Sequence, residues 1–304
     1  MTRINQPIES PHESVQSAIG RIPILADGGG EWAISSLPSF TNRTYRIVRG
    51  GEVLVLRLPG RGTERYIDRV GEAANARAAA SIGLSPEILY ADPPSGVLVS
   101  RYVDGAEPLS LLRLRQPAEL RATVGLLKQL HHSGLIFQGE MRLYPKLDEY
   151  LGLADAPALT SLRREGEGLR RILEAGWGPL RPCHIDPAPH NFIAAGSRRY
   201  LLDWEYSAQC EPLWDLAGLA IEGEFDAGQD ARMLAAYFGK AEAAWLSRLH
   251  LYKIMLRLLA AAWGAVQLAD TNGPAEIAGL VDRLTAKVQA DLGAADLGRH
   301  IQTA

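Results

Sequence analysis

The sequence predicts an α+β protein of two lobes, in which a small antiparallel-sheet lobe precedes a larger, mostly helical lobe. Short runs rich in β-branched residues, separated by turn sequences, fill the chain up to about residue 103. Beyond that point apolar residues recur at helical spacing. At 304 residues with 47% hydrophobic content, the chain is long enough to bury a core in each lobe.

The first lobe is expected to contain a tight hairpin, a helix and a second pair of strands. A Gly-Gly pair joins the hairpin strands, Gly83 follows the alanine-rich helix, and the turn sequence DPPSG joins the later strands. The expected elements are strands at 44–49 and 53–58, a helix over 66–81, and strands at 87–91 and 96–103.

The second lobe is expected to open with a helix over 118–132, after Pro117. A further hairpin is predicted from residues 191–195 and 200–203. The apolar stretch 254–269 is interrupted by Arg257, which favours a buried helix over a membrane span. The predicted organisation is a loose leader with a short helix at 1–30, a small lobe at 31–103, and a larger lobe at 104–304.

The composition indicates a small-molecule partner. A net charge of −3 provides no cationic field for nucleic acid or for an anionic membrane surface. The two cysteines lack metal-type spacing, and the first residues contain no apolar signal segment. We therefore expect reduced thiols, a cytoplasmic location, no membrane insertion and no nucleic-acid partner, without a prediction of oligomeric state.

The segment HIDPAPHN, residues 184–191, has the spacing of the H-x-D-x-x-x-x-N catalytic loop of kinases. Such a loop presents the Asp186 carboxylate to an incoming hydroxyl, while the Asn191 amide oxygen at its far end reaches Mg²⁺. Asp203 ends an apolar strand twelve residues later, where a second metal ligand is expected. The D-x-x-x-x-N spacing alone is also common turn chemistry, so the prediction rests on the combination. His184 is interpreted as structural.

The nucleotide side requires a cation, and Arg57 ends the strand VLVLRLP where kinases carry a lysine. An exposed strand residue is the alternative interpretation of Arg57. Glu72 on the following helix favours the functional one, because kinases orient this cation with a helix glutamate. The loop SFTNRTY contains no glycine-rich motif, so its amides and hydroxyls would contact the phosphates.

Together these segments resemble the choline/ethanolamine kinase family within the aminoglycoside-phosphotransferase-like kinases, over nearly the whole chain. The resemblance covers SFTNRTY, VLRLPGRGTERYIDRVGE, IGLSPEILYADPPSGVLVSRYVDG, CHIDPAPHNFI and LLDWEYSAQCEPLWDLAGLAIE. It implies a two-lobed protein-kinase-like fold that uses ATP and Mg²⁺. Asp186 would be the general base. Asn191 and Asp203 would hold the metal, and Asp215 would support the catalytic loop or act as a helix N-cap. The implied nucleotide-binding residues are Thr41, Asn42, Arg57, Glu72 and Tyr102.

The same resemblance implies a substrate pocket containing Glu222, Trp263 and Tyr206, with Glu205 beside the metal or in contact with a second one. Aromatic faces and carboxylates suit a quaternary ammonium. The residues alone favour Trp263 as plain core and Glu222 as a solvated acid. Two positions depart from the family pattern: Ile185 stands where asparagine is common, and Ala260 where a second tryptophan is frequent.

The sequence therefore predicts a kinase that phosphorylates choline or a related amino-alcohol, with a nucleotide-binding lobe at 31–103 and a catalytic and substrate-binding lobe at 104–304. The open Ala260 side of the pocket keeps thiamine, an aminoglycoside or a sugar as alternative acceptors. A nucleotide-binding regulator without catalysis is a further alternative, which the presence of Asp186, Asn191 and Asp203 together disfavours.

Overall fold

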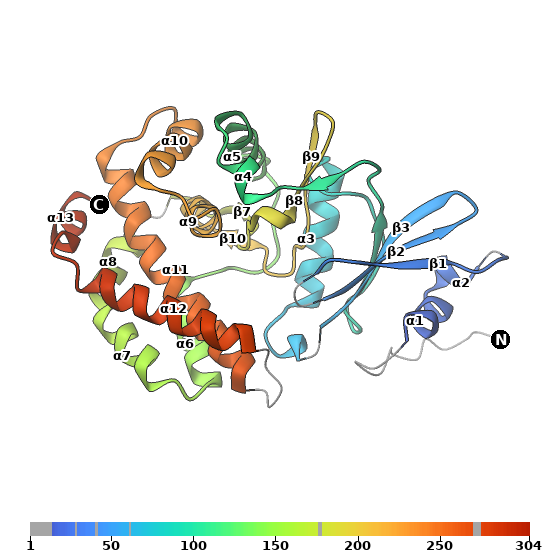
Figure 1. Ribbon diagram of the computed structural model, residues 1–304, viewed down its shortest axis with the longest axis horizontal. Helices are drawn as coiled ribbons and strands as arrows, with labels where there is room; N and C mark the ends of the chain where they lie inside the picture. Colours follow the sequence, from blue (N-terminus) through green and yellow to red (C-terminus); the bar gives the residue numbers. More distant parts are fainter. Residues whose placement is uncertain (1–13, 28, 40–41, 61, 176–177, 270–274) are drawn as a thin grey trace. The chain divides into compact units, whose positions relative to one another are not determined.

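The computed structural model describes residues 14–27, 29–39, 42–60, 62–175, 178–269 and 275–304, and these form two compact units. Unit 1 comprises the described residues up to Pro108 together with Asn191–Ser207. Unit 2 comprises Leu109–His190 together with Ala208–Ala304. Unit 1 is built on an antiparallel sheet and unit 2 is mostly helical, which confirms the predicted fold class (Figure 1).

Unit 1 contains a five-stranded antiparallel sheet in the order β1-β2-β3-β5-β4, and a three-stranded sheet in the order β6-β8-β9. Its helices are α1, α2 and α3, and α3 packs against β4. The elements are α1 (Val15–Arg21), α2 (Pro23–Ala26), β1 (Ala33–Leu37), β2 (Arg43–Arg49), β3 (Glu52–Leu58), η1 (Thr63–Arg65), α3 (Arg69–Ser81), β4 (Ile88–Asp92), β5 (Val97–Arg101), β6 (Glu107–Pro108), β8 (Phe192–Ala195) and β9 (Arg198–Leu201).

The predicted β2–β3 hairpin is present, with Gly50 and Gly51 at φ +57° and +85° in the turn. The helix expected from residue 66 begins later, at Arg69, because residues 63–65 form a separate 3₁₀ turn. Asp68 caps α3 by accepting hydrogen bonds from the amides of residues 70 and 71, both at 3.0 Å. This cap fixes the first turn of α3, which carries two charged residues of the candidate site.

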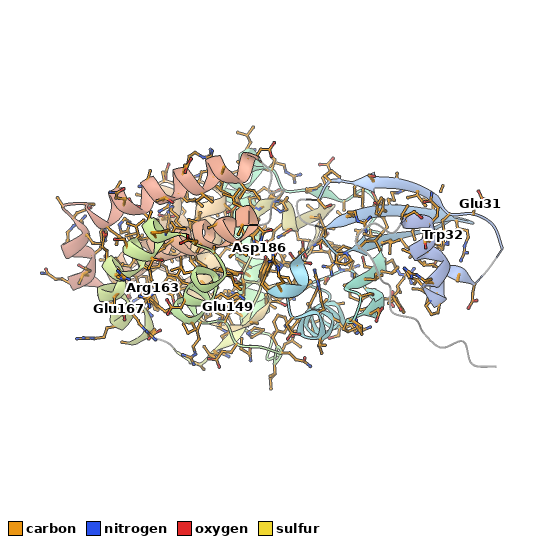
Figure 2. The ribbon with its side chains drawn as sticks, turned by 90° about the horizontal axis from the view of Figure 1, so that it is seen from below. Glu31, Trp32, Glu149, Arg163, Glu167 and Asp186 are labelled. Atoms are coloured by element: carbon orange, nitrogen blue, oxygen red, sulfur yellow. The ribbon has the colours of Figure 1, made fainter. Side chains whose placement is uncertain are left out.

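The prediction of a loose leader is wrong for residues 15–26. Helices α1 and α2 pack on the five-stranded sheet, and Ala18, Ile22 and Leu25 are at most 1% exposed within its core. Trp32 belongs to the same core and links it to α2, because its indole donates a hydrogen bond to the Leu25 carbonyl at 3.0 Å (Figure 2). The apolar spacing from residue 18 to residue 25 is a helical stripe, which the sequence interpretation did not use.

The hairpin β8–β9 belongs to unit 1, although it follows helices of unit 2 in the chain. Strand β8 pairs with β6, and the Leu201 amide donates to the Leu84 carbonyl at 2.8 Å. Non-local pairing of this kind leaves no local signal in the sequence. The predicted functional boundary between residues 103 and 104 stays a prediction.

Unit 2 consists of helices around a two-stranded ribbon, β7–β10. The long helix α11 packs against α6, α9, α12 and α13, and α11 and α12 run side by side (Figure 1). The elements are α4 (Leu111–Leu114), α5 (Pro117–His131), α6 (Leu143–Leu153), α7 (Pro157–Glu165), α8 (Glu167–Ala175), β7 (Arg181–Cys183), β10 (Ala208–Cys210), α9 (Pro212–Glu222), α10 (Ala227–Phe238), α11 (Ala243–Ala269), α12 (Ala275–Leu292) and α13 (Leu297–Thr303), with the 3₁₀ turn η2 (Pro189–Asn191) after β7.

Helix α11 is the one helix of the described residues with the length and apolar character of a membrane span. Within its apolar window, 67% of the residues are buried in the structure, as in a core helix. Buried polar contacts fix it in place. Arg248 donates to the Ile172 and Leu173 carbonyls, both at 2.6 Å, and contacts the Glu211 carboxylate, which also accepts from the Tyr252 hydroxyl.

Surface ion pairs contribute less to the stability of unit 2. Arg163 of α7 contacts Glu167 of α8, and Asp148 of α6 at 2.9 Å (Figure 2). Both acidic side chains are more than half exposed, so solvent and salt screen these pairs.

The contact between α11 and α13 is expected to weaken in acid. The rings of His250 and His300 stack at 4.2 Å between centroids, and Nε2 of His250 is buried without a partner among the described residues. The pKa of His250 is lowered, mainly by burial and secondly by the neighbouring His300. Asp291 and Asp296 raise this pKa, but by less. The folded protein therefore binds this proton less readily than the unfolded chain, and stability falls as pH drops through about 6.5.

We predict that His250→Leu reduces the loss of Tm between about pH 7.5 and about pH 5.5 by a few degrees, as measured by thermal unfolding. Gln289→Leu is the control, because Gln289 is an exposed side chain of the same unit that does not titrate. A Tm loss as large in His250→Leu as in the wild-type protein would contradict the prediction.

Candidate active site

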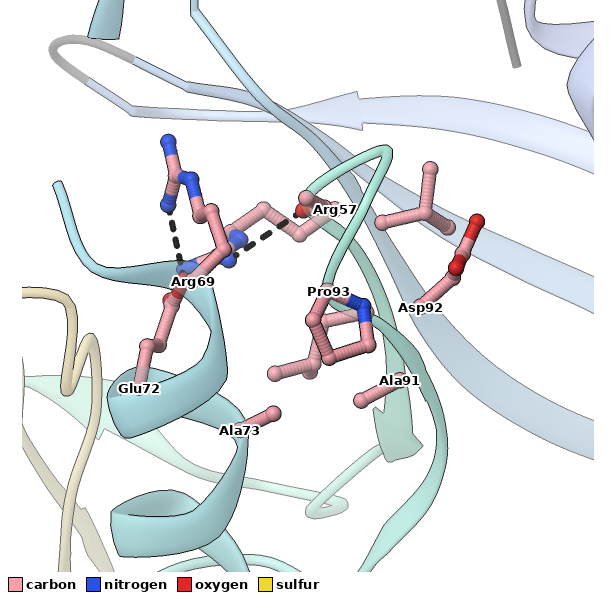
Figure 3. Close-up of a pocket in the computed structure, with 10 residues that line it drawn as sticks. Arg57, Arg69, Glu72, Ala73, Ala91, Asp92 and Pro93 are labelled. Atoms are coloured by element: carbon pink, nitrogen blue, oxygen red, sulfur yellow. Dashed lines mark hydrogen bonds and ion pairs between the residues drawn. The ribbon is translucent and has the colours of Figure 1, made fainter. Parts of the chain in front are cut away.

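The predicted strand-to-helix ion pair is present in unit 1. Arg57 of β3 contacts Glu72 of α3, and the two residues are 8% and 3% exposed. Arg57 also donates to the Gly96 carbonyl at 3.4 Å, and these groups line a pocket bounded by β3, α3 and the β4–β5 turn (Figure 3). Arg57 is therefore not an exposed strand residue.

The electrostatics of this pair favour the charged forms of both partners. Burial alone would lower the pKa of Arg57, but Glu72, and after it Asp203, raise this pKa above its usual value. Burial alone would raise the pKa of Glu72, but Arg57 and then Arg69 hold it below its usual value. A permanently charged guanidinium held by a buried carboxylate is a suitable contact for phosphate oxygens.

Carboxylates suited to a metal ion lie next to this pair. Asp203 follows β9 with φ +63°, and its Oδ1 lies 3.2 Å from Nη1 of Arg57. Carboxylate oxygens of Glu72, Asp203 and Glu205 all lie within 4.8 Å of one another. Oxygen donors in such a group fit Mg²⁺. Asn191 is 4% exposed, and its carbonyl accepts from the Leu202 amide at 2.8 Å, directly before Asp203.

Asn42 joins the loop between β1 and β2 to the same carboxylates. Its Nδ2 donates to Oε2 of Glu205 at 3.1 Å, and its Oδ1 accepts from the Gly60 amide at 3.2 Å. Thr41 lies outside the described residues. Tyr102 follows β5 and is half-buried, with Cζ of Arg46 5.1 Å from its ring centroid. Among the hydrogen bonds that the structure describes, one links Asn42 to Glu205, and none links Tyr102 to the charged residues of the site.

Sequence reasoning missed Arg69, the first residue of α3. Its Nη1 lies 2.8 Å from Glu72 and 3.2 Å from Glu205, and its Nη2 donates to the Thr63 hydroxyl at 2.7 Å. The signal was available, because an arginine three residues before Glu72 shares its helix face.

In unit 2, the backbone around Asp186 is held by Asp215 from the first turn of α9. Asp215 is fully buried, and its carboxylate accepts from the amides of His184 at 2.8 Å and Ile185 at 2.7 Å. Glu211 precedes the helix as its N-cap residue, so the N-cap interpretation of Asp215 is wrong. Asp186 itself is half-buried, and its carbonyl accepts from the Ala188 amide at 2.9 Å (Figure 2).

The loop adopts an unusual conformation at Ile185, whose φ is +74°. A β-branched residue in this region is strained by about 1–3 kcal/mol. The hydrogen bond to Asp215 and a second one, from the indole of Trp214 to the Ile185 carbonyl at 3.1 Å, hold the backbone there. The strain is located directly beside Asp186, which is typical of a functional loop.

His131 of α5 is a second residue that sequence reasoning missed. It is fully buried, with Nε2 2.9 Å from Asp215 and Nδ1 2.7 Å from the Tyr237 hydroxyl. Its isolated place in a helical pattern gave no signal. The Cys183 sulfur lies within 4.8 Å of ligand atoms of His131 and Asp215, but burial raises the pKa of this thiol, so its protonated form does not suit a metal.

The predicted substrate residues lie on three different elements. Glu222 ends α9 and is exposed, Trp263 is half-buried in α11, and the two helices pack on each other. Tyr206 is half-buried in the segment after β9, in unit 1. Their convergence on one substrate stays a prediction.

The contacts in unit 1 resemble those around the phosphates of ATP in kinases: a strand cation, its helix glutamate and carboxylates close enough to share a metal ion. Together with the two kinds of unit, they define a kinase-like phosphotransferase.

Comparison with known proteins agrees with this class. A crystal structure of a choline/ethanolamine kinase family protein from Mesorhizobium loti is 36% identical, with a TM-score of 0.81 over 95% of this chain and 97% of that chain. A crystal structure of LicA in complex with AMP is 25% identical, with a TM-score of 0.73 over 86% of this chain and 93% of that chain. The model of the phosphotransferase enzyme family matches residues 33–247. The chain belongs to this phosphotransferase family and, within it, to the choline/ethanolamine kinase family.

A LicA protein from Haemophilus influenzae is 29% identical over 196 residues, which are 62% of this chain. The match covers 57% of that LicA, so the chain spans less than two thirds of the length of this relative.

Proposed function

We propose that this protein transfers the γ-phosphoryl group of ATP to the hydroxyl of choline or a related amino-alcohol. The contacts of Arg57 with Glu72 and Asp203 support the proposal, because they join the cation proposed to bind phosphate to a carboxylate proposed to bind the metal. Use of ATP is supported by membership of the family and by the AMP complex of the LicA relative.

Asp186 orients the acceptor hydroxyl and receives its proton in this proposal. Asp215 keeps the loop backbone at Ile185 in its strained form, so that the Asp186 carboxylate is held in one orientation. Mg²⁺, when bound, neutralises charge on the phosphates. Asn191 and Asp203 would hold it, with Glu205 beside them. Arg57, oriented by Glu72, would contact the phosphate oxygens.

Choline is the acceptor that the family relationship favours, and the chemistry of the predicted pocket agrees with it. A quaternary ammonium binds to aromatic faces with carboxylates nearby, and Trp263, Tyr206 and Glu222 would provide such groups. The sequence carries Ala260 one helical turn before Trp263, so a bulkier acceptor is the main alternative. The buried free thiols of Cys183 and Cys210 are compatible with the cytoplasmic location that we propose.

The test is ADP release from ATP with Mg²⁺, measured against choline, ethanolamine, thiamine, a sugar and an aminoglycoside. We expect kcat/KM for choline or ethanolamine to exceed that for the other acceptors by about tenfold or more. Turnover with only one of the other acceptors would refute choline or ethanolamine as the acceptor, and it would still support the kinase activity. Absence of phosphoryl transfer, together with retained nucleotide binding, would favour a regulator.

A further inference from the structure

The two arginines of the unit 1 cluster contact the same carboxylates that would hold a metal ion. Nη1 of Arg57 lies 3.2 Å from Asp203, and Nη1 of Arg69 lies 3.2 Å from Glu205. Both arginines also contact Glu72 (Figure 3). The oxygen groups suited to Mg²⁺ are therefore paired with guanidinium groups in this structure.

These charges interact strongly because most of them are buried. The side chains of Arg57 and Arg69 are each 10% exposed, and those of Glu72 and Glu205 are 3% and 5% exposed. Two positive and three negative groups leave the cluster with one net negative charge. A divalent cation would reverse this sign, and guanidinium groups next to that cation would repel it unless an anion such as phosphate enters as well.

Arg69 can lose its contact with Glu205 and still keep its contacts with Glu72 and Thr63. One nitrogen, Nη1, is shared between Glu72 at 2.8 Å and Glu205 at 3.2 Å, so the Glu205 contact is the longer one. Nη2 donates separately to the Thr63 hydroxyl at 2.7 Å. Loss of the Glu205 contact therefore leaves a buried arginine that is still paired and hydrogen-bonded, which avoids the large cost of an isolated buried charge.

Glu205 likewise keeps a second donor, because Nδ2 of Asn42 lies 3.1 Å from the same oxygen that Arg69 contacts. The exchange of Arg69 for a metal ion would therefore leave the carboxylate oriented.

We propose that Arg69 is a positioning residue that occupies Glu205 in the absence of ligands and releases it when metal and nucleotide enter together. It thereby makes Mg²⁺ and nucleotide bind cooperatively. This inference rests on the proposed function, because it assumes that nucleotide phosphates bind beside this cluster. It assigns to Arg69 a role in the coupling between metal and nucleotide binding, in addition to structural support for α3.

The test measures binding without acceptor or turnover. The probes are Mn²⁺ alone, followed by electron paramagnetic resonance, and ADP with and without Mg²⁺, followed by calorimetry. Arg69→Met removes the charge and keeps the length of the side chain. We expect this variant to bind Mn²⁺ alone about fivefold more tightly than the wild-type protein, because no guanidinium then competes with the metal for Glu205. We expect it to bind Mg·ADP more weakly, because the phosphates then lose a neighbouring positive charge. Arg69→Lys should restore much of the wild-type coupling.

Arg77→Met is the matched control, because Arg77 is an exposed arginine of the same helix. It should change neither affinity. A purely structural Arg69 would weaken the binding of both ligands in Arg69→Met, and that result, or an unchanged Mn²⁺ affinity, would overturn the inference. Failure of the wild-type protein to bind Mg·ADP would instead refute the proposed function.

Discussion

Asp186→Asn should lower kcat by about 10²–10⁴-fold while the KM for ATP stays close to that of the wild-type protein. The amide keeps the size of the carboxylate but does not accept the proton of the acceptor hydroxyl. Because Asp186 is half-buried and Asp215 holds the backbone of the two residues before it, the substitution should leave the loop folded. Steady-state kinetics with the preferred acceptor and thermal unfolding of both proteins measure these quantities.

The matched control is Asp226→Asn in the same unit. Asp226 caps α10 through the Gln229 amide at 2.7 Å, and asparagine is an equally good cap residue. It should retain turnover and Tm. Full turnover in Asp186→Asn would exclude Asp186 as the general base.

The local elements of this protein were predictable from short-range chemistry. The Gly-Gly turn, Gly83 after α3 and Pro117 at the start of α5 each mark a boundary that the structure contains within a few residues. The exception is the start of α3, where Asp68 in the sequence YIDRV is a recognisable N-cap.

The contacts that organise the site depended on residues far apart in the chain. Glu72 was predictable as the partner of Arg57 because kinases share this pair. Arg69, by contrast, contacts Glu205 across 136 positions, and His131 contacts Asp215 across 84. Helical periodicity identifies a face of a helix, but not the residue that this face meets.

The structure also changes the interpretation of Ile185, which stands where asparagine is common in the family. The sequence suggested the loss of a polar side-chain contact. The structure shows a β-branched residue at φ +74°, where asparagine is accommodated more easily. Ile185 therefore strains the backbone, and the hydrogen bonds that the His184 and Ile185 amides donate to Asp215 offset this strain.

Asp215→Ala should reduce stability by about 3 kcal/mol and lower kcat more than any substitution of the surface acids of unit 2. It removes the acceptor of the His184 and Ile185 amides and of His131, and it leaves these buried donors unsatisfied. Without these bonds, Ile185 is expected to relax to negative φ and to turn Asp186 away from its orientation. Chemical denaturation and steady-state kinetics measure the two effects.

A double-mutant cycle with Ile185→Gly separates the role of Asp215 in holding the strained backbone from its role as a buried acceptor. Glycine adopts φ +74° without strain. In the Ile185→Gly background, Asp215→Ala should therefore lower kcat less than it does in the wild-type background, with a coupling energy of about 1 kcal/mol or more. Equal effects of Asp215→Ala in both backgrounds would show that Asp215 acts only as a buried acceptor. A smaller effect beside glycine would show that the geometry of Asp186 depends on the backbone of its neighbour.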